Sequence, residues 1–326
     1  MNKVEIIGTG SYLPPKVVDN NDLSLIVDTS DEWITSRTGI KGRRISQGED
    51  TSDMATKAAM QAIKNSKINV EDIELIILAT VTPDSFMPST ACIVQKNIKA
   101  INATCFDISA ACSGFVYGLD IATQFIRAGR FKNVLVIGAD TFSKIIDWKD
   151  RNTCILFGDG AAAAFLRSGE EDQILSIYTG SDGSKGDALT CPAVTVNNPY
   201  VDSVISPIKS VVGMDGREIF KFAVKVLEKS VKALIKEANC NLEEIKYIIP
   251  HQANYRIIEC AAKKLGIDMS KFYMNLDVYG NTSAASIGIA LDEVRKKNLV
   301  KKGDKILIVG FGGGLTYGGF ILKVNL

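Results

Sequence analysis

Short runs of β-branched and apolar residues alternate along the chain with longer segments of helical periodicity. Helices packed on sheets produce this alternation, so the pattern predicts an α/β protein. The strands predicted from the short runs cover residues 74–79, 103–108, 134–138, 247–249, 273–276 and 305–309.

Three segments have clear helical patterns. After Gly216, apolar residues recur at steps of four and three from Phe220 to Ala238, which predicts an amphipathic helix that packs on a sheet and exposes its lysines. Segments 113–126 and 283–294 are instead apolar or small on nearly every face. Both are therefore expected at the centre of the molecule, buried on all sides.

The order of these segments indicates an internal duplication. Similar strands at 73 and 245 and at 133 and 305, and similar strand–helix junctions around Cys112 and Asn281, are each separated by about 170 residues. We expect two similar halves, 1–172 and 173–326, that share one interface because no Pro- or Ser-rich linker separates them. Glycine-broken apolar runs at 155–166 and 306–324 predict a hairpin near the end of each half.

Composition and charge exclude several classes of function. The 326 residues are 46% hydrophobic and carry 38 basic and 37 acidic side chains, a net charge of +1, which is typical of a globular protein and gives no general reason to bind nucleic acid or an anionic membrane. No apolar stretch approaches membrane-spanning length, so we expect a cytoplasmic protein. The seven scattered cysteines are expected to be free thiols, and one histidine cannot build a His-rich metal site.

Cys112 is the first candidate for chemistry. It lies in the run ACSGF, between a predicted strand and a predicted helix. The free amides and the dipole of a helix N-terminus favour a thiolate, and small neighbours would let a substrate approach. The alternative is a small buried hydrophobic residue, which is the commoner role of a free cysteine.

Three further candidates lie in the second half. His251 follows the strand 247–249, Asn281 lies in GNTSAAS, and a glycine-rich turn occupies 312–314. Sites in α/β folds are built at strand ends, where a neutral amide and free backbone N–H groups can stabilise an oxyanion. A hydrogen-bonded structural histidine, a capping asparagine and a simple hairpin turn are the alternatives.

Taken together, these segments resemble β-ketoacyl-acyl-carrier-protein synthase III, the condensing enzyme that initiates bacterial type II fatty-acid synthesis. The resemblance rests on seven ordered blocks: GTGSYLP at 8, DTSDEWITSRTGI at 28, ACSGF around Cys112, DRNTCILFGDGAAA at 150, PHQANYRII at 250, GNTSAAS at 280 and FGGGLTYG at 311. It implies a thiolase fold, with two duplicated βαβαβαββ halves in α-β-α-β-α layers, and a catalytic triad of Cys112, His251 and Asn281.

The resemblance also implies a two-stage reaction. Cys112 would take the acyl group from an acyl-CoA, with its own amide and that of Gly313 forming the oxyanion hole. Malonyl-acyl-carrier-protein would then enter, and His251 and Asn281 would stabilise the enolate formed as carbon dioxide leaves. No metal and no redox cofactor would be needed, and the protein would be a homodimer in which the strand 103–108 can supply the shared surface.

Binding residues follow from the same resemblance. Met87 and Phe157 would line the acyl pocket, with Met87 at a position where the family often has Phe. Trp33 and Arg151 would hold the adenine of CoA between them; the full set of expected CoA contacts is Thr29, Trp33, Arg37, Arg151, Gly216, Phe220 and Asn254. A basic patch of Lys221, Arg256, Lys263 and Lys264 would receive the acidic carrier protein.

Other functions remain open at this point. One is a specialised starter synthase or acyltransferase of secondary metabolism on the same scaffold. Another is a non-catalytic CoA-binding protein, although such a protein would have no need of Cys112, His251 and Asn281 together. A nucleotide-binding oxidoreductase is excluded, because Gly8 and Gly10 begin a dinucleotide fingerprint whose third glycine is replaced by Leu13.

Overall fold

Two sheets form the centre of the computed structural model, which describes residues 1–196, 198–200 and 209–325. The first sheet has five strands in the order β1-β7-β6-β4-β5, which are Lys3–Tyr12, Gly160–Gly169, Asn133–Asp140, Leu75–Ala79 and Thr104–Ile108. The second has four in the order β11-β12-β13-β8, which are Ile245–Pro250, Lys305–Gly312, Thr316–Lys323 and Ile174–Ser181. The expected boundary at 172/173 falls between the two sheets.

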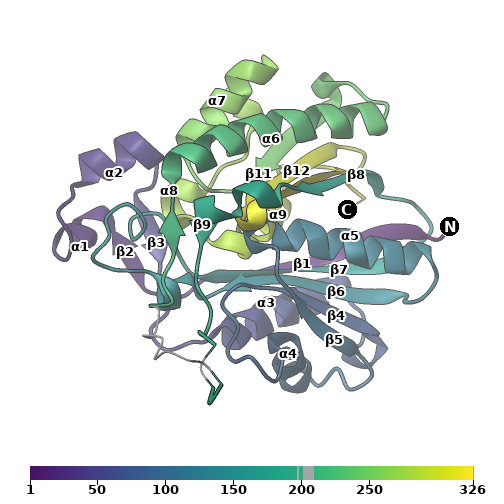
Figure 1. Cartoon of the computed structure of the whole chain (residues 1–326). Helices are drawn as coiled ribbons and strands as arrows, with labels where there is room; N and C mark the ends of the chain where they lie inside the picture. Colours follow the sequence, from purple (N-terminus) through teal and green to yellow (C-terminus); the bar gives the residue numbers. More distant parts are fainter. Residues whose placement is uncertain (197, 201–208, 326) are drawn as a thin grey trace.

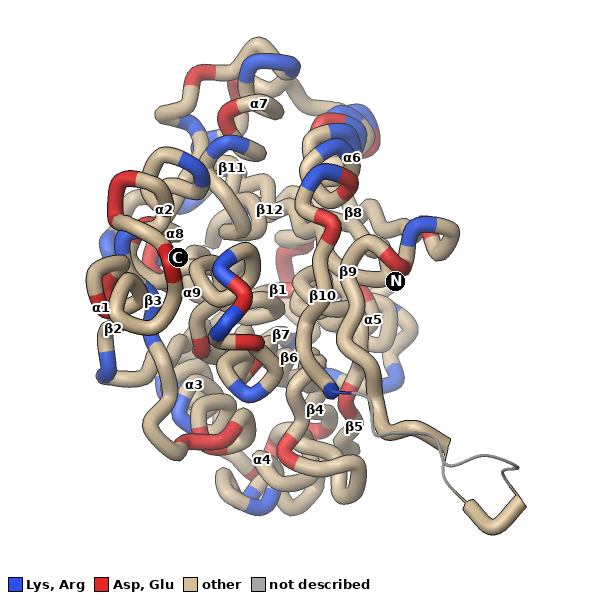
Figure 2. Tube along the Cα trace, turned by 60° about the vertical axis from the view of Figure 1, so that its left-hand side comes forward, with Lys and Arg blue, Asp and Glu red and all other residues tan. Residues whose placement is uncertain are grey.

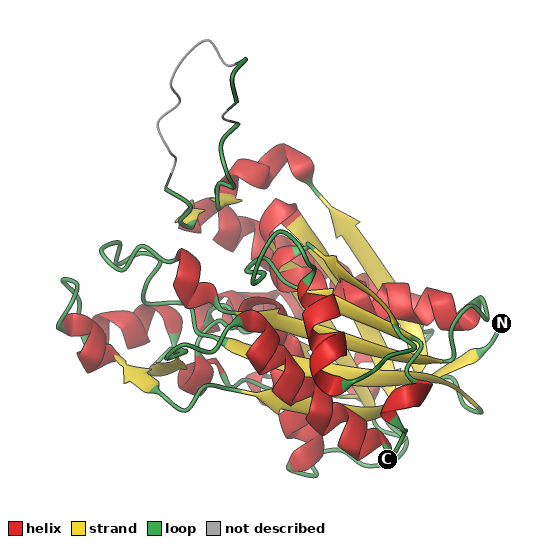
Figure 3. Ribbon diagram, turned by 90° about the horizontal axis from the view of Figure 1, so that it is seen from below, coloured by secondary structure: helices red, strands yellow, loops and turns green. Residues whose placement is uncertain are grey.

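Helices cover both sheets and fill the space between them (Figures 1 and 3). Helices α3 (Thr51–Ser66) and α4 (Thr90–Ile98) lie on the outer face of the first sheet, and α6 (Gly216–Glu237) and α7 (Tyr255–Leu265) cover the outer face of the second. Helices α5 (Gly114–Arg127) and α9 (Ser286–Lys296) lie between the sheets. This α-β-α-β-α arrangement is the one expected of a thiolase fold.

The sequence explains which helices are central. In α5, the residues that face the sheets are fully buried, from Phe115 to Ile126. In α9, the run Ser286–Leu291 is buried without interruption, so no face of that segment is left for solvent. Helix α6 instead buries one stripe, including Leu227 and Leu234, and its N-terminus is capped by the side chain of Asp215.

Most predicted elements are confirmed, including the strands at 74–79, 103–108, 134–138, 247–249 and 305–309, all three helices, and the 306–324 hairpin, which forms as β12 and β13. The strand predicted at 273–276 is wrong, because this segment makes one isolated bridge to β11 at Phe272 and then enters the short helix α8 (Leu276–Tyr279). The hairpin predicted at 155–166 is also wrong. Only its second arm is a strand, β7, and Phe157 pairs with Asn281 instead.

The smaller elements surround the end of the molecule where the two sheets meet. They are β2 (Val17–Asp19), α1 (Asn20–Ser24), α2 (Asp31–Thr38), β3 (Gly42–Arg44), β9 (Leu189–Thr190) and β10 (Gly213–Met214). Among the residues that the structure describes, no helix has the length and apolar character needed to cross a membrane.

Candidate active site

Cys112 lies at the start of the central helix α5, in the single 3-10 turn Ala111–Ser113 that follows β5. Ala111 has a positive φ of 45°, so the chain turns sharply from strand to helix at this point. Strained backbone of this kind is concentrated at functional sites. The turn leaves Cys112 4% exposed, with its Sγ atom 3.6 Å from the Oγ atom of Ser283.

The second half repeats this turn. Ser283 has a φ of 49° and begins the 3-10 turn Ser283–Ala285 that leads into α9. Just before it, the Oδ1 atom of Asn281 accepts a hydrogen bond of 2.9 Å from the backbone N–H of Ser283. This contact identifies Oδ1 as the acceptor, so the amide Nδ2 of Asn281 is left to donate to a ligand.

His251 directly follows β11 and is 1% exposed. Its backbone N–H donates to the carbonyl of Val309 on β12 at 2.8 Å, which extends the parallel pairing by one residue. Its Nδ1 atom lies 2.6 Å from the Oγ atom of Ser286, and the ring of Phe311 packs against the imidazole edge to face at 5.2 Å. The imidazole is thus fixed by its backbone, one hydrogen bond and one aromatic contact.

One short segment, Asn281–Ser286, connects the three expected catalytic residues. It contains Asn281, contacts Cys112 through Ser283, and contacts His251 through Ser286. Cys112, His251 and Asn281, which lie about 30 to 170 positions apart in the sequence, are therefore connected through the first turn leading into α9.

Burial controls the ionisation of both titratable members of this group. It raises the pKa of the Cys112 thiol to about 12, although the hydrogen bond to Ser283 acts in the opposite direction. Burial also lowers the pKa of His251 to about 3. The thiol and the neutral imidazole are the resting forms near neutral pH. Burial therefore opposes the thiolate that the helix N-terminus was expected to favour.

Asp140, at the carboxyl end of β6, lies beneath the site and is fully buried. Its Oδ1 accepts hydrogen bonds from the Thr80 and Thr82 hydroxyls and from the Val81 backbone, and its Oδ2 accepts one from the backbone N–H of Ala284 at 3.2 Å. Burial raises the pKa of Asp140, and its charge raises that of Cys112. Asp140 thus connects the first sheet to the turn before α9.

The glycine-rich end of β12 lies against Cys112. A Cβ atom at Gly312 would lie 2.7 Å from the backbone nitrogen of Cys112, so no side chain is tolerated there. Gly313 lines the same cavity as Cys112. The Oγ1 atom of Thr316 is 3.0 Å from the carbonyl oxygens of both Gly313 and Ala110, which holds the two expected oxyanion-hole segments side by side.

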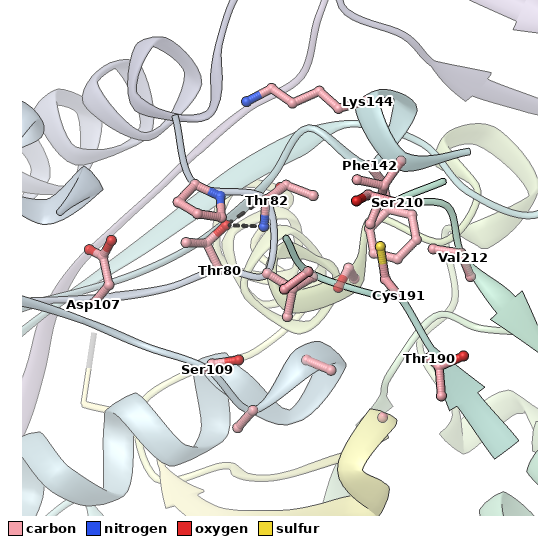
Figure 4. Close-up of a pocket in the computed structure, with 18 of the residues that line it drawn as sticks. Thr80, Thr82, Asp107, Ser109, Phe142, Lys144, Thr190, Cys191, Ser210 and Val212 are labelled. Carbon is pink, nitrogen blue, oxygen red and sulfur yellow. Dashed lines mark hydrogen bonds between the residues drawn. The ribbon is translucent and has the colours of Figure 1, made fainter. Parts of the chain in front are cut away.

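A cavity of about 780 Å³ leads from Cys112 to the surface. Figure 4 shows Phe142, Cys191, Ser210 and Val212 on one side of it and Asp107 on the other. Its lining is mainly apolar and includes Val81, Pro83, Phe86, Ile108, Phe142, Ile145, Leu189, Val194 and Val212. The cavity is suited to an acyl chain attached to Cys112.

The two residues expected in the acyl pocket lie elsewhere in the single chain. Met87 is 86% exposed and does not line the cavity, whereas its neighbour Phe86 does. Phe157 is buried behind the cavity and stacks on Phe142 with ring centroids 4.1 Å apart. Phe142 and Phe86 are therefore the aromatic lining residues, and Phe157 supports one of them from behind.

Trp33 on α2 lies between two arginines. The guanidinium carbons of Arg37 and Arg151 are 4.6 and 5.0 Å from the centroid of its ring. Arg151 also donates to the backbone carbonyl of Asp28 at 3.0 Å. Arg151 therefore lies over the Trp33 ring in the free chain, and the expectation that the two residues hold an adenine between them stays a prediction.

The other expected CoA contacts extend from α2 toward α6 and α7. Asn254 caps α7 and donates through Nδ2 to the backbone carbonyl of Arg37 at 3.1 Å, so these two residues are neighbours. Gly216 begins α6, and Phe220 lies one turn later. The hydroxyl of Thr29 is buried, with no hydrogen-bond partner within the part of the chain that the structure describes. Among the described residues that line the cavity, none belongs to the expected CoA set.

The expected carrier-protein patch spans α6 and α7, which carry basic and acidic positions side by side (Figure 2). Lys221 pairs with Glu218 at 2.7 Å, and Lys263 pairs with Glu259 at 3.2 Å. Lys264 is 3.9 Å from a carboxylate on α6, and Arg256 is exposed. Neighbouring carboxylates therefore partly offset the charge of the patch.

Sequence reasoning missed Ser283, Ser286 and Asp140. Asp140 could have been found from the sequence, because it is a polar residue at the end of an apolar strand, as His251 is. The serines belong to GNTSAAS, but no local pattern tells which serine of that run faces a partner. Within the described ranges, no group of three or more His, Cys, Asp or Glu side chains is placed to hold a metal ion.

Comparison with known proteins places these observations in a family. Models of 3-oxoacyl-[acyl-carrier-protein] synthase III match residues 106–183, and the C-terminal model of the same family matches residues 235–324. The chain is 74% identical over 324 residues to β-ketoacyl-[acyl-carrier-protein] synthase III of Clostridium kluyveri, covering 99% of this chain and 100% of that protein.

Solved structures agree. A 3-oxoacyl-[acyl-carrier-protein] synthase III from Aquifex aeolicus shares 48% identity with a TM-score of 0.92, covering 98% of this chain and 100% of that one. The priming β-ketosynthase of the R1128 polyketide pathway shares 32% identity with a TM-score of 0.91, covering 99% and 96%. With its thiolase fold and its buried cysteine, histidine and asparagine, the chain belongs to the β-ketoacyl-acyl-carrier-protein synthase III family.

Proposed function

We propose that Cys112, His251 and Asn281 carry out the two stages of the condensation by which this family initiates fatty-acid synthesis. The chain is an acyltransferase that joins an acyl group from an acyl-CoA primer to malonyl-acyl-carrier-protein. The observation that supports these residue roles most strongly is the segment Asn281–Ser286, which contacts Cys112 and His251 and itself carries Asn281.

In the first stage, Sγ of Cys112 attacks the carbonyl carbon of the acyl-CoA thioester. The backbone N–H groups of Cys112 and Gly313 stabilise the oxyanion. The CoA thiolate leaves and takes up the proton that the Cys112 thiol has lost. Because the thiol pKa is high, the proton leaves as the carbon–sulfur bond forms, not before it.

In the second stage, the malonyl thioester loses carbon dioxide and its carbonyl oxygen becomes an enolate oxygen. A neutral His251 and the Nδ2 of Asn281 donate hydrogen bonds to that oxygen. The carbanion attacks the acyl-cysteine, a carbon–carbon bond forms, and Cys112 leaves as a thiolate that is reprotonated. The products are 3-oxoacyl-acyl-carrier-protein, CoA and carbon dioxide.

The apolar cavity that begins at Cys112 receives the acyl chain in this proposal, with Phe86 and Phe142 near it. CoA would approach from Trp33, Arg37 and Asn254, and carrier protein from Arg256 and the neighbouring lysines. A CoA adenine would then displace Arg151 from the Trp33 ring. None of these residues lines the cavity, so the proposal places them at the outer end of the route to the sulfur.

We also infer a homodimer formed through β5. Among the described strands, β5 pairs with β4 alone, so its other edge is open. Thr104 and Ile108 direct their backbone groups toward the β4 side, so Cys105 and Asp107 direct theirs outward. Exposed Phe86 lines the same cavity as Asp107, which places apolar surface beside this edge.

A cytoplasmic location is part of the proposal. The seven cysteines are free thiols, as is usual in a reducing compartment. Acyl-CoA primers would be available to the enzyme there.

The central experiment detects the acyl-enzyme. Incubation with an acyl-CoA followed by intact-mass measurement is expected to show an adduct in wild type and in Cys191→Ser, which removes the exposed thiol of the same cavity. Cys112→Ser is expected to show none. An adduct that persists in Cys112→Ser would overturn the proposal.

A specialised starter synthase is the second candidate, supported by the likeness to the R1128 priming enzyme. A panel of acyl-CoA primers offered with malonyl-acyl-carrier-protein separates the two. A preference for short primers supports the fatty-acid role, whereas turnover restricted to one unusual acyl group would support the specialised one.

A further inference from the structure

Ser286 is the only hydrogen-bond partner of the His251 side chain among the residues that the structure describes. Its Oγ atom lies 2.6 Å from Nδ1, and no other hydrogen bond of that hydroxyl is formed with the described residues. Ser286 is 1% exposed, and so is His251. Neither group can exchange this contact for one with bulk water.

A neutral imidazole carries its single proton on either Nδ1 or Nε2, and the contact with Ser286 distinguishes the two. If Nδ1 carried the proton, it would donate to Oγ, and the hydroxyl proton of Ser286 would be buried without an acceptor. Leaving a buried donor unsatisfied disfavours this tautomer. If Nδ1 is unprotonated, the hydroxyl donates to it and both groups are satisfied.

We propose that Ser286 is a positioning residue that holds His251 as the tautomer protonated on Nε2. The inference rests on the proposed role of His251 as a donor to the enolate oxygen and explains why that role is possible. The other tautomer would present the lone pair of Nε2 to a developing negative charge.

The location of Ser286 suits this task. As the first residue of α9, it is held by a helix that is buried between the two sheets. Phe311 packs edge to face on the same imidazole, and the backbone N–H of His251 is bonded to Val309. The hydroxyl therefore contacts a ring that is also packed against Phe311.

The protein is well suited to a direct test, because His251 is its one histidine. Protein produced without a histidine tag and labelled with nitrogen-15 in histidine gives one imidazole spectrum. Long-range proton–nitrogen correlations in the resting enzyme then identify the protonated nitrogen. We expect Nε2 to be protonated and Nδ1 to be the unprotonated acceptor.

Variants extend the test. In Ser286→Ala the spectrum is expected to shift to a mixture of tautomers or to the Nδ1-protonated form, and Ser286→Thr is expected to restore the wild-type form. Ser230→Ala is the matched control, since Ser230 on α6 is also fully buried but its hydroxyl has no hydrogen-bond partner among the described residues. Its spectrum should equal that of wild type.

Kinetics give a second readout. Ser286→Ala should slow decarboxylation of a malonyl thioester roughly tenfold to a hundredfold, through kcat more than KM, and leave acylation by acyl-CoA within about twofold. A merely structural role would lower both rates together.

Two outcomes overturn the inference: a wild-type spectrum with the proton on Nδ1, and a Ser286→Ala protein whose spectrum and decarboxylation rate match wild type. The wild-type spectrum decides even where the alanine variant fails to fold. If His251→Ala decarboxylates normally, the proposed function fails instead, and the spectrum still reports the tautomer independently.

Discussion

The Sγ atom of Cys112 lies 3.6 Å from the Oγ atom of Ser283. The backbone N–H of Ser283 donates a hydrogen bond of 2.9 Å to Oδ1 of Asn281. The residue between the nucleophile and the asparagine thus serves both, through its side chain and its main chain. A substitution of the Ser283 side chain leaves the main-chain contact in place. The two contributions can therefore be separated by experiment.

The division of labour among the catalytic residues is the first prediction. His251→Ala and Asn281→Ala should leave acylation of Cys112 largely intact, because the hydrogen-bond partner of its sulfur among the described residues is Ser283. Both should reduce malonyl decarboxylation by about 10²–10³, the usual effect of removing an oxyanion donor. CoA release and carbon dioxide release are assayed separately. Equal loss of both activities in all variants, Cys112→Ser included, would contradict the scheme.

The second prediction concerns the thiol. Because burial raises the pKa of Cys112 to about 12, inactivation by iodoacetamide should accelerate roughly tenfold per pH unit from pH 7 to 10 without a plateau. Ser283→Ala should slow it further at each pH, since that hydroxyl lowers the thiol pKa. The Cys191→Ser background removes the exposed thiol of the same cavity. A plateau near neutrality would show that a thiolate of Cys112 predominates.

The third prediction links His251 to stability. Its pKa falls from an ordinary 6.5 to about 3 on folding, so between these values the unfolded chain binds the extra proton. Stability should therefore decrease as pH falls below 6.5, with this residue contributing on the order of 1 kcal/mol per pH unit. Urea unfolding at pH 4.5, 5.5 and 6.5 compares wild type with His251→Gln. If the free energy of unfolding changed equally with pH in both proteins, the predicted contribution of His251 would be refuted.

The fourth prediction concerns Trp33. Trp33→Ala should raise KM for acyl-CoA roughly tenfold, because a stacking surface for adenine is lost, and leave the malonyl stage unchanged. Binding can be followed directly in Trp148→Phe, which leaves Trp33 as the single tryptophan. Displacement of Arg151 by CoA should change the fluorescence of Trp33. An unchanged KM would show that the nucleotide binds elsewhere.

The fifth prediction concerns the open edge of β5. Cys105→Pro removes an outward backbone N–H from that edge and should shift a dimer toward monomer. Cys105→Ser keeps the N–H and serves as the control. Light scattering after size-exclusion chromatography measures the mass. A wild-type monomer, or a proline variant that dimerises normally, would show that β5 is not the interface.

Much of the fold follows from local pattern. The apolar strands β4, β6 and β12 and the uniformly small or apolar helices α5 and α9 carry their burial in their own residues, and the structure places them as predicted. The segment 273–276 was misassigned because its apolar residues pack under α7 and α6 without joining a ladder. Periodicity alone cannot distinguish a short apolar strand from a short apolar segment that packs without strand pairing. The two-half division at 172/173 stays a prediction.

The site was predictable only in part. Cys112, His251 and Asn281 stand at strand or helix ends, where polar residues can be recognised. Whether Arg151 stacks on Trp33, and whether Met87 faces a cavity, depends on loop geometry that no local pattern specifies. The elevated thiol pKa likewise depends on how much protein surrounds the sulfur, which only a folded structure reveals.

The buried carboxylate of Asp140 accepts from residues of the first sheet and from the backbone of Ala284. A chain cut into two co-expressed pieces would have to reassemble around this buried contact before either piece could react. The first sheet and the turn before α9 are therefore joined by a buried contact, and circular permutants that keep this contact intact should tolerate new termini elsewhere.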